Sequence, residues 1–559
     1  MKKQLALTFL FLALFIGKAL GWGSGHDDQT RLMFEMLPSE IQAILSEEQR
    51  DELIRHYSHF PDSGGDLDPG KIGEKGYAFA VGHDVKGVYG FHGSKGKATA
   101  FVLLTRAFAG NDPDLAALWM GTIVHSIGDE AACNHDPLVS YITYAFKAYG
   151  IPMEMGTGLD YSDVAKTEEG KAVVAELAKN FKPAIISENP EEALRYLLMS
   201  EAEGNAFMTS RGATIAAAYK PAASEQTVAE ARRALAELGQ YGAERAANVI
   251  LTAWHYAKQG KAATLDFDEE LLKKAEEAEK AFIAARSLSS DSIFTGLLDG
   301  AQSGPAVGVL IEPSQKMNRT YLGFSSKYIS AAAMRAMKEN GIPWRAVDLR
   351  TMDPENPPTV ADMPVMMVCS GGARLPQPAL DALKIYVKEG GKLLWIGGRD
   401  SGLLGDLSKS LAPADDADLP VLGKYGAGND DTIKKASMLF KGPLAAALSA
   451  EPFPFLRNPN TKAGWQKPYC PYQIDVTRPN LKPLAILKVG EKTFPVAAAL
   501  EDAGETAHVF IPEYLVAPFL LTPALELQDV SMPLFDSVGA KVFLSCLKAL
   551  DSSFAGKSR

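Results

Sequence analysis

The spacing of apolar residues changes between residues 260 and 306 of this 559-residue chain, and this change limits the folds open to each half. Beyond residue 306, short apolar runs alternate with helical segments, as at Ala306–Ile311, Ser326–Asn340 and Trp344–Leu349. Such alternation predicts a parallel sheet with crossover helices, an α/β fold. Before residue 260, apolar residues recur three and four apart, which predicts amphipathic helices and an all-α fold. These helices are expected at Thr30–Ile44, Ala98–Phe108, Asp114–Ile127, Glu191–Met199 and Val228–Tyr256.

The chain is long enough for several domains with separate cores. A charged amphipathic helix at Asp266–Arg286 and the polar segment Ser287–Ser292 mark the change between them. From about residue 415 onward, prolines and β-like runs become more frequent. We therefore expect a helical domain, a helical linker, an α/β domain and a β-rich C-terminal region, at residues 22–260, 261–300, 301–415 and 416–559 respectively.

Residues 1–21 have the pattern of a secretory signal peptide. Two lysines precede the apolar run Leu5–Ile16, which is too short to cross a membrane comfortably, and Ala19-Leu20-Gly21 supplies a small-residue cleavage site. No other segment approaches a transmembrane length. The sequence therefore predicts a secreted or periplasmic protein without a transmembrane segment, whose mature N-terminus is Trp22.

Histidines are concentrated near the N-terminus, which random scatter would rarely produce. Seven of the nine lie in the first quarter of the chain: His26, His56, His59, His83, His92, His125 and His135. Imidazole is the commonest metal ligand in proteins, so this concentration predicts a metal centre. The α-amino group and carbonyl oxygen of Trp22 could hold an ion together with His26, four residues later. His56 and His59 flank an expected helix end, where we expect surface or capping roles.

The segment His125–His135 carries the most specific metal-binding pattern. His125 and Asp129 lie four residues apart, so both side chains project from one face of the expected helix. An imidazole nitrogen and a carboxylate oxygen at this spacing can share a zinc ion at about 2.0–2.2 Å. The preceding run Leu115–Val124 would bury this helix, and a cation would offset the cost of burying its charge. Such a pair alone more often forms a simple hydrogen bond, but Trp22 and the clustered histidines favour a metal.

These residues resemble the zinc-dependent phospholipase C and single-strand-specific nuclease superfamily. The resemblance covers about residues 22–260. It rests on the N-terminal tryptophan, on Gly23-x-Gly25-His26, on Pro61-Asp62, on a further histidine, and on His125-x3-Asp129-x5-His135. It implies a mostly helical domain that holds three zinc ions and hydrolyses phosphate esters.

The resemblance also implies which residues hold the ions. One ion would be held by Trp22, His26 and Asp129, and a second by Asp62, a loop histidine, His125 and Asp129. We prefer His92 as the loop histidine because an expected helix follows it closely, and His83 is the alternative. Asp62 taken alone would also suit a turn. The implied ligands are Trp22, His26, Asp62, His92, His125, Asp129 and His135, with His83 and Asp160 as further candidates.

The third ion lacks part of its implied ligand set. The family places a second histidine–acid pair shortly after the position of His135, but this chain has no histidine between His135 and His255. The resemblance therefore implies two zinc ions and leaves the third open. The carboxylates that could substitute are Glu154, Asp160, Asp163, Glu201 and Glu203.

The implied activity is hydrolysis of a phosphodiester bond by a hydroxide that bridges two zinc ions. Asp62 would orient or deprotonate the attacking water. The net charge of −11 argues against broad binding to nucleic acid, although bound cations would still supply positive charge for a phosphate. The expected substrate is therefore a phospholipid or nucleotide phosphate ester, with no stable nucleic-acid partner. The alternative is a zinc-stabilised binding or scaffold protein with a degenerate phosphoesterase site. The oligomeric state stays open.

The C-terminal half resembles a glutamine amidotransferase-like domain of the flavodoxin type. The resemblance rests on the strand and helix order and on Ser370-Gly371-Gly372 after the run Pro364–Cys369. A catalytic member would need a nucleophilic cysteine at a strand-to-helix elbow and a later histidine–acid pair. Cys369 is near such an elbow, but the one later histidine, His508, has no acid in a His-x-Glu arrangement. We therefore expect a non-catalytic docking or scaffolding domain.

Overall fold

The computed structural model forms two compact units. The first comprises Met1–Val139 and Glu154–Arg286, and the second comprises Ser140–Met153 and Ser287–Arg559. The structure describes residues 24–61, 91–133, 136, 138–139, 161–219, 223–301, 303–311, 326–369, 375–396, 411–413, 436–449, 453–454, 472–474, 479–489, 491–511, 515–516 and 537–555.

The regular secondary structure in the described residues of the first unit is helical, which confirms the helical character expected for the N-terminal region. Its α-helices are α2 (Ser24–Met36), α3 (Ser39–Gln42), α4 (Glu47–Arg55), α6 (Ser94–Gly110), α7 (Pro113–Ala131), α9 (Tyr161–Lys166), α10 (Glu168–Ala178), α11 (Pro190–Ala217), α12 (Glu225–Lys258) and α13 (Glu269–Ala285). Short 3-10 turns, η1 (Tyr57–His59) and η4 (Lys261–Ala263), complete it.

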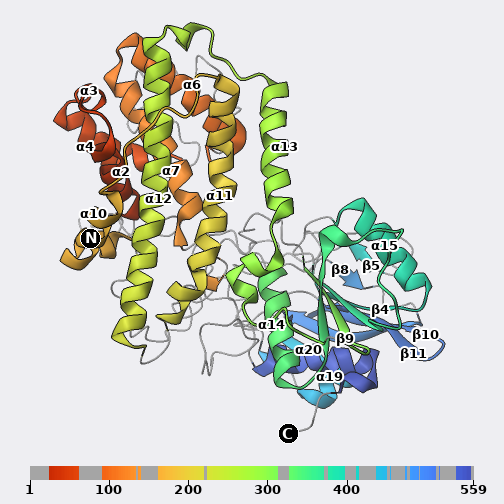
Figure 1. The fold of residues 1–559 in the computed structure, drawn as a ribbon. Coiled ribbons are helices and arrows are strands. Elements are labelled where there is room, and N and C mark those ends of the chain that lie inside the picture. Colours follow the sequence, from red (N-terminus) through yellow and green to blue (C-terminus); the bar gives the residue numbers. More distant parts are fainter. Residues whose placement is uncertain are drawn as a thin grey trace, which may run out of the picture. The chain divides into compact units, whose positions relative to one another are not determined.

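Helix α7 lies at the centre of this unit, in contact with α6, α11 and α12 (Figure 1). Every residue from Leu115 to Asp129 is buried, as expected for a helix that is apolar on all sides. Its start is defined by Asp112, whose side chain accepts a hydrogen bond from the Leu115 backbone N–H, and by Pro113 in the first turn. His125 and Asp129, near the end of α7, are therefore carried on a fully packed helix.

The first expected helix, Thr30–Ile44, is divided in two in the structure. Helix α2 ends at Met36, and α3 begins at Ser39 after Pro38. Proline has no backbone N–H to donate and its ring crowds the preceding turn, so one helix cannot continue through it. The break lets α2 run separately beside α7 and α12.

The second unit is built on one mixed nine-stranded sheet with the order β2-β1-β3-β4-β11-β10-β9-β6-β7. Strands β2, β1, β3, β4 and β11 are parallel, and β11, β10, β9, β6 and β7 are antiparallel. Its strands are β1 (Val307–Ile311), β2 (Trp344–Asp348), β3 (Val365–Cys369), β4 (Lys392–Ile396), β6 (Ala436–Phe440), β7 (Phe453–Pro454), β9 (Leu481–Val489), β10 (Lys492–Asp502) and β11 (Glu505–Ile511). A separate pair is formed by β5 (Leu411–Pro413) and β8 (Tyr472–Ile474).

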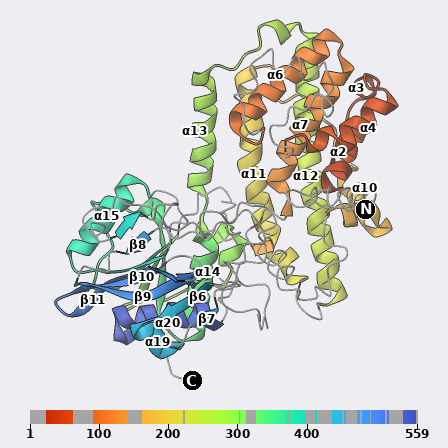
Figure 2. The same ribbon diagram turned by 180° about the vertical axis from the view of Figure 1, so that it is seen from behind.

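Helices cover both faces of this sheet (Figures 1 and 2). Helix α15 (Gln377–Lys388) lies on one face, and α14 (Ser326–Glu339), α19 (Gly442–Ala447) and α20 (Ser537–Leu550) lie on the other. The chain leaves β1 through α14 toward β2, and leaves β3 through α15 toward β4, in opposite directions along the sheet. Because parallel crossovers are right-handed, opposite directions place the two helices on opposite faces.

The β-like runs expected as a separate C-terminal region belong to this same sheet. Strand β11 pairs in parallel with β4, where His508 aligns with Leu393 and Ile511 with Ile396. The α/β character expected for the C-terminal half is thus confirmed, as a mixed sheet with helices. Within the described residues of the whole chain, no helix is both long and apolar enough to span a membrane.

Candidate metal centre

Helix α7 places His125 and Asp129 together at its C-terminal end. One helical turn separates the two residues, and both are buried, with the His125 Nε2 atom 3.6 Å from Asp129 Oδ2. His26, near the start of α2, approaches Asp129 from another direction, with its Nε2 atom 3.2 Å from Asp129 Oδ1. His26, His125 and Asp129 form a fully buried group whose ligand atoms lie within 4.8 Å of one another, a geometry that could hold a metal ion.

His92 adds a third imidazole to this group. Its Nε2 atom lies 2.9 Å from Asp129 Oδ2 and 3.0 Å from the Nε2 atom of His125. The chain is held here by Ser126 on α7, whose hydroxyl lies 2.9 Å from the carbonyl oxygen of the preceding residue, Phe91. The two carboxylate oxygens of Asp129 therefore face different histidines, Oδ1 toward His26 and Oδ2 toward His92 and His125.

A backbone carbonyl determines the tautomer of His125. The Nδ1 atom of His125 lies 2.6 Å from the carbonyl oxygen of Ser58 in η1. A carbonyl oxygen only accepts, so Nδ1 carries the proton and the Nε2 lone pair of a neutral ring faces Asp129 and His92. A hydrogen bond of this kind from the far nitrogen is typical of a metal-binding histidine, because it orients the ring and raises its basicity.

The distances among these atoms suit coordination to a metal. Ligands at about 2.0–2.1 Å from a tetrahedral zinc ion lie roughly 3.3 Å from one another. The distances from Asp129 to His26, His92 and His125 are 3.2, 2.9 and 3.6 Å. One carboxylate contacted on both oxygens can serve two adjacent ions, so the donor set fits at least one divalent cation.

His26 is neutral at neutral pH. Burial, followed by the proximity of His125, lowers the pKa of His26 to about 4. The ring of His26 stacks on that of His125, with centroids 4.1 Å apart and an interplanar angle of 20°. Two protonated imidazoles at this distance would repel each other. Neutral rings avoid this repulsion and keep their nitrogen lone pairs available to a cation.

One side of the group is accessible to solvent. The side chain of His92 is 31% exposed, whereas those of His26 and His125 are inaccessible. The ring centroid of His59 lies 5.9 Å from that of His26, and the His59 Nε2 atom lies 2.6 Å from Asp27 Oδ1. Solvent therefore reaches the group at His92. The sequence assigned His59 a surface or capping role and gave no signal for its contact with Asp27.

Several expected site residues lie outside the described part of the chain. They are Trp22, Asp62, His83, His135, Glu154 and Asp160. The contacts of Trp22 with His26, the role of Asp62 and the choice between His92 and His83 therefore remain predictions. His56 ends α4 as its C-cap residue and is exposed, which fits the expected capping role.

Two carboxylates considered for a third ion are engaged by cations instead. Glu201 on α11 pairs with the buried Lys97, with 2.6 Å between Lys97 Nζ and Glu201 Oε2. Glu203 pairs with Arg245 on α12. His255, in the last turn of α12, pairs with Glu188, with 2.6 Å between His255 Nε2 and Glu188 Oε1. The structure therefore gives each of these three residues a partner other than the histidine group.

Two residues that matter to this region were missed by sequence reasoning. The Ser58 carbonyl has no sequence signal, because any residue supplies a backbone oxygen. Lys97 did carry a signal, since it precedes Phe101 and Leu104 at four and seven residues, which is the spacing of the buried face of α6. A lysine in register with core residues predicts a buried charge with a carboxylate partner.

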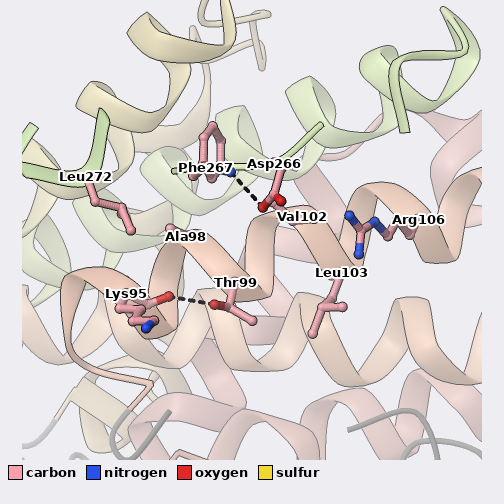
Figure 3. Close-up of a pocket in the computed structure, with 9 residues that line it drawn as sticks. All are labelled: Lys95, Ala98, Thr99, Val102, Leu103, Arg106, Asp266, Phe267 and Leu272. Atoms are coloured by element: carbon pink, nitrogen blue, oxygen red, sulfur yellow. Dashed lines mark hydrogen bonds between the residues drawn. The ribbon is translucent and has the colours of Figure 1, made fainter. Parts of the chain in front are cut away.

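A surface hollow of about 220 Å³ lies on another face of α6. It is lined by Lys95, Ala98, Thr99, Val102, Leu103, Arg106, Asp266, Phe267 and Leu272. Figure 3 shows Lys95 and Arg106 at separate points along α6, with Phe267 and Asp266 from the segment that precedes α13. None of its lining residues belongs to the histidine group, so the hollow is not part of the candidate metal centre.

Cys369 and His508 of the second unit are not arranged as a catalytic pair. Ile396 on β4 aligns with Cys369 on one side and with Ile511 on the other, and His508 aligns with Leu393. His508 therefore lies three residues before the level of Cys369, about 10 Å along the strands. Its Nδ1 atom accepts a hydrogen bond from the Leu393 backbone N–H, at 3.2 Å. This is a structural role in the sheet.

Comparison with known proteins assigns no family. No protein-family model matches the chain, and no curated protein sequence matches it. Among solved structures, it is similar to the exo-beta-1,4-mannosidase Op5Man5 from Opitutaceae bacterium strain TAV5, with 10% sequence identity and a TM-score of 0.23. The match covers 60% of this chain and 52% of that one, so the chain spans about half of its length. A likeness of this size carries no argument about function.

Proposed function

We propose that the N-terminal unit is a zinc-dependent phosphoesterase that hydrolyses phosphodiester bonds, of the phospholipase C and single-strand-specific nuclease type. The observation that carries this proposal is the group formed by His26, His92, His125 and Asp129, in which both oxygens of one buried carboxylate face imidazole nitrogens. Imidazole and carboxylate donors suit zinc. The spacing of His125 and Asp129, together with His26 near the mature terminus, carries the resemblance to that superfamily.

In this mechanism, bound zinc would act as a Lewis acid on the phosphoryl group and lower the pKa of a water molecule. The chain's own residues hold and orient the site. The Ser58 carbonyl keeps the proton of His125 on Nδ1. The low pKa of His26, about 4, keeps that imidazole neutral at neutral pH. The partly exposed side chain of His92 is the proposed approach for a phosphate ester, and Asp62 is proposed to orient or deprotonate the attacking water.

The proposed location is outside the cytoplasm, because residues 1–21 resemble a signal peptide whose removal exposes Trp22. The second unit is proposed as a non-catalytic flavodoxin-type scaffold, since Cys369 and His508 lie at different levels of its sheet. A phospholipid or nucleotide phosphate ester is the proposed substrate.

The test is metal content together with turnover in the purified chain that begins at Trp22. We expect at least two zinc ions per chain by elemental analysis and hydrolysis of a generic phosphodiester. Asp129→Asn should remove bound zinc and activity together. A neutral amide offers one weak ligand oxygen in place of the two carboxylate oxygens, of which one faces His26 and the other faces His92 and His125. His56→Gln, which changes an exposed histidine of α4, is the matched control and should retain both.

A separate variant tests the terminus. One additional residue before Trp22 moves the free α-amino group away from His26, so zinc content and activity should both fall. Unchanged values would remove Trp22 from the site. Zinc binding without turnover on phospholipid, nucleotide and phosphomonoester substrates would favour the alternative, a zinc-stabilised binding protein with a degenerate site. Its supporting observation is that Glu201 and Glu203 pair with Lys97 and Arg245.

A further inference from the structure

Lys97 is among the least accessible charged residues of the described chain, with a relative exposure of 1%. It lies in the first turn of α6 and faces the helical core rather than solvent. Lysine is almost never buried unless a partner holds its charge. A buried ammonium therefore identifies a place where the fold requires a cation.

Two carboxylates from two other helices hold this ammonium. The Nζ atom of Lys97 lies 2.6 Å from Oε2 of Glu201 on α11 and 3.8 Å from Oε1 of Glu130 on α7. The second oxygen of Glu130, Oε2, accepts a hydrogen bond from the Asn205 side-chain amide at 2.8 Å. Helices α7 and α11 approach closely here, since a Cβ on Gly204 would lie 3.3 Å from that of Glu130. The carboxylates are thus positioned by packed helices and not by mobile loops.

This charge cluster adjoins the candidate metal centre. Glu130 directly follows Asp129 on α7, and successive side chains on a helix point about 100° apart, toward neighbouring faces. Lys97 follows His92 by five residues at the start of α6. The histidine group and the lysine cluster therefore share the end of α7, one on each of two adjacent faces.

We propose that the Lys97 ammonium takes the place of an additional divalent cation beside the metal centre. Glu130 and Glu201 supply carboxylate oxygens, the ligands that Mn²⁺ and Mg²⁺ prefer. A covalently attached ammonium supplies positive charge between them without any dissociable ion. The functional role of this ammonium rests on the proposed metal-dependent hydrolysis. The ability of Glu130 and Glu201 to bind a divalent cation when Lys97 is replaced does not.

The test replaces Lys97 by an uncharged residue and counts bound Mn²⁺, an ion that prefers oxygen ligands. Wild-type chain and the Lys97→Met variant are first saturated with zinc, then dialysed against Mn²⁺, and bound manganese is measured by elemental analysis and electron paramagnetic resonance. We expect no retained manganese in the wild type and about one ion per chain in Lys97→Met, because two carboxylates then face each other without Lys97. The count does not depend on turnover, so it is separable from the proposed activity.

Two controls make the count specific. Lys95→Met removes an exposed lysine from the same helix and should retain no manganese. Lys97→Met combined with Glu201→Gln removes one of the two carboxylates and should lose the added ion. A folded Lys97→Met variant that retains no manganese would overturn the proposal, as would manganese retention by Lys95→Met.

A second variant covers the case in which methionine destabilises the fold. Lys97→Gln is also neutral and can still donate hydrogen bonds to a carboxylate. Its far-ultraviolet circular dichroism should be native in excess Mn²⁺, and its thermal midpoint should rise on adding Mn²⁺ by more than that of the wild type. If both Lys97 variants remain unfolded in excess Mn²⁺, a divalent cation cannot replace the ammonium and the proposal fails.

Discussion

At the residue scale, Gly121 determines how closely η1 approaches α7. A Cβ added at Gly121 would lie 2.6 Å from the backbone carbon of Tyr57, a separation that real Cβ atoms do not show. The next residue, Ser58, supplies the carbonyl oxygen bound by His125, which lies one turn after Gly121 on α7. The absence of a side chain at position 121 is therefore what allows the backbone of η1 to reach His125.

Gly121→Ala should weaken metal binding without changing any ligand. The added methyl group must move η1 away, which stretches the bond from His125 Nδ1 to Ser58. Overpacking of this kind costs about 1–3 kcal/mol of unfolding free energy, and loss of the supporting hydrogen bond typically weakens metal affinity about 10–100-fold. Zinc titration and chemical denaturation measure both effects. Gly110→Ala, where no atom lies within 4 Å of the added Cβ, is the matched control and should leave both unchanged.

His508 makes the second unit sensitive to acid. Burial lowers its pKa to about 4, below the ordinary value of 6.5. The unfolded chain therefore takes up a proton at this residue before the folded chain does. The stabilising contribution is complete above pH 6.5 and is lost as the pH falls toward 4.

His508→Gln should reduce this acid sensitivity, because glutamine can accept from the Leu393 N–H and does not titrate. Between pH 6.5 and 4.5, we expect the wild type to lose about 2–3 kcal/mol more unfolding free energy than the variant. Hydrogen exchange of the β4 and β11 amides reports this loss within the second unit. Equal pH dependence in the two proteins would mean that His508 does not carry the effect.

At the element scale, α2 is held against α7 and α12 through a glutamine that fits between two glycines. The side chain of Gln29 is fully buried, and its Nε2 atom donates to the Gly239 carbonyl oxygen at 3.2 Å. A Cβ on Gly128 would lie 2.0 Å from Gln29 Oε1, and one on Gly242 would lie 2.2 Å from Gln29 Nε2. Since His26 lies one helical turn before Gln29 on α2, this contact also sets the position of His26.

Gly242→Ala should therefore be costly in the wild type and less costly when Gln29 is shortened. In the wild type, the methyl group displaces Gln29, with an expected loss of about 1–3 kcal/mol. In a Gln29→Ala background, the space is already open, so the two changes should couple by about 0.5–3 kcal/mol. A double-mutant cycle from denaturant unfolding measures the coupling. Strict additivity of the two changes would contradict this packing.

At the scale of the whole molecule, the two units have separate cores and separate determinants of stability. The first includes the histidine group and the Lys97 cluster, and the second depends on the mixed sheet that joins β4 to β11. A ligand that binds only the folded state stabilises the part of the structure that holds it. Metal binding should accordingly stabilise the first unit.

Removal of metal by a chelator should lower amide protection in α2 and α7 and leave β4 and β11 unchanged. The reason is that His26, His125 and Asp129 would lose the ion that they share. None of these three residues belongs to the sheet that contains β4 and β11. Hydrogen exchange with mass spectrometry resolves the two units, and zinc added back should restore protection. Loss of protection in β4 at the same chelator concentration would show that the units are not separate in stability.

The sequence predicted the class of each half because helical and strand periods are local properties. The spacing of Leu115–Val124 predicted a buried helix, and His125 and Asp129 on that helix predicted a shared metal site at one face. The apolar runs Ala306–Ile311 and Trp344–Leu349 appear as strands β1 and β2, each within one residue of its predicted bounds. Only the break at Pro38 divides a helix that the pattern treated as continuous.

Tertiary structure decided which distant residues meet. The pairing of β11 with β4, the Ser58 carbonyl on His125, and the two carboxylates around Lys97 all join segments that are far apart in the sequence. Periodicity shows which face of an element is buried but not which partner covers it, because the partner depends on how whole elements pack. The sequence alone determined that His125 and Asp129 lie together on one face of α7, and the α and α/β character of the two halves. Packing alone determined the tautomer of His125, the neutral state of His26 and the cation that accompanies Glu130.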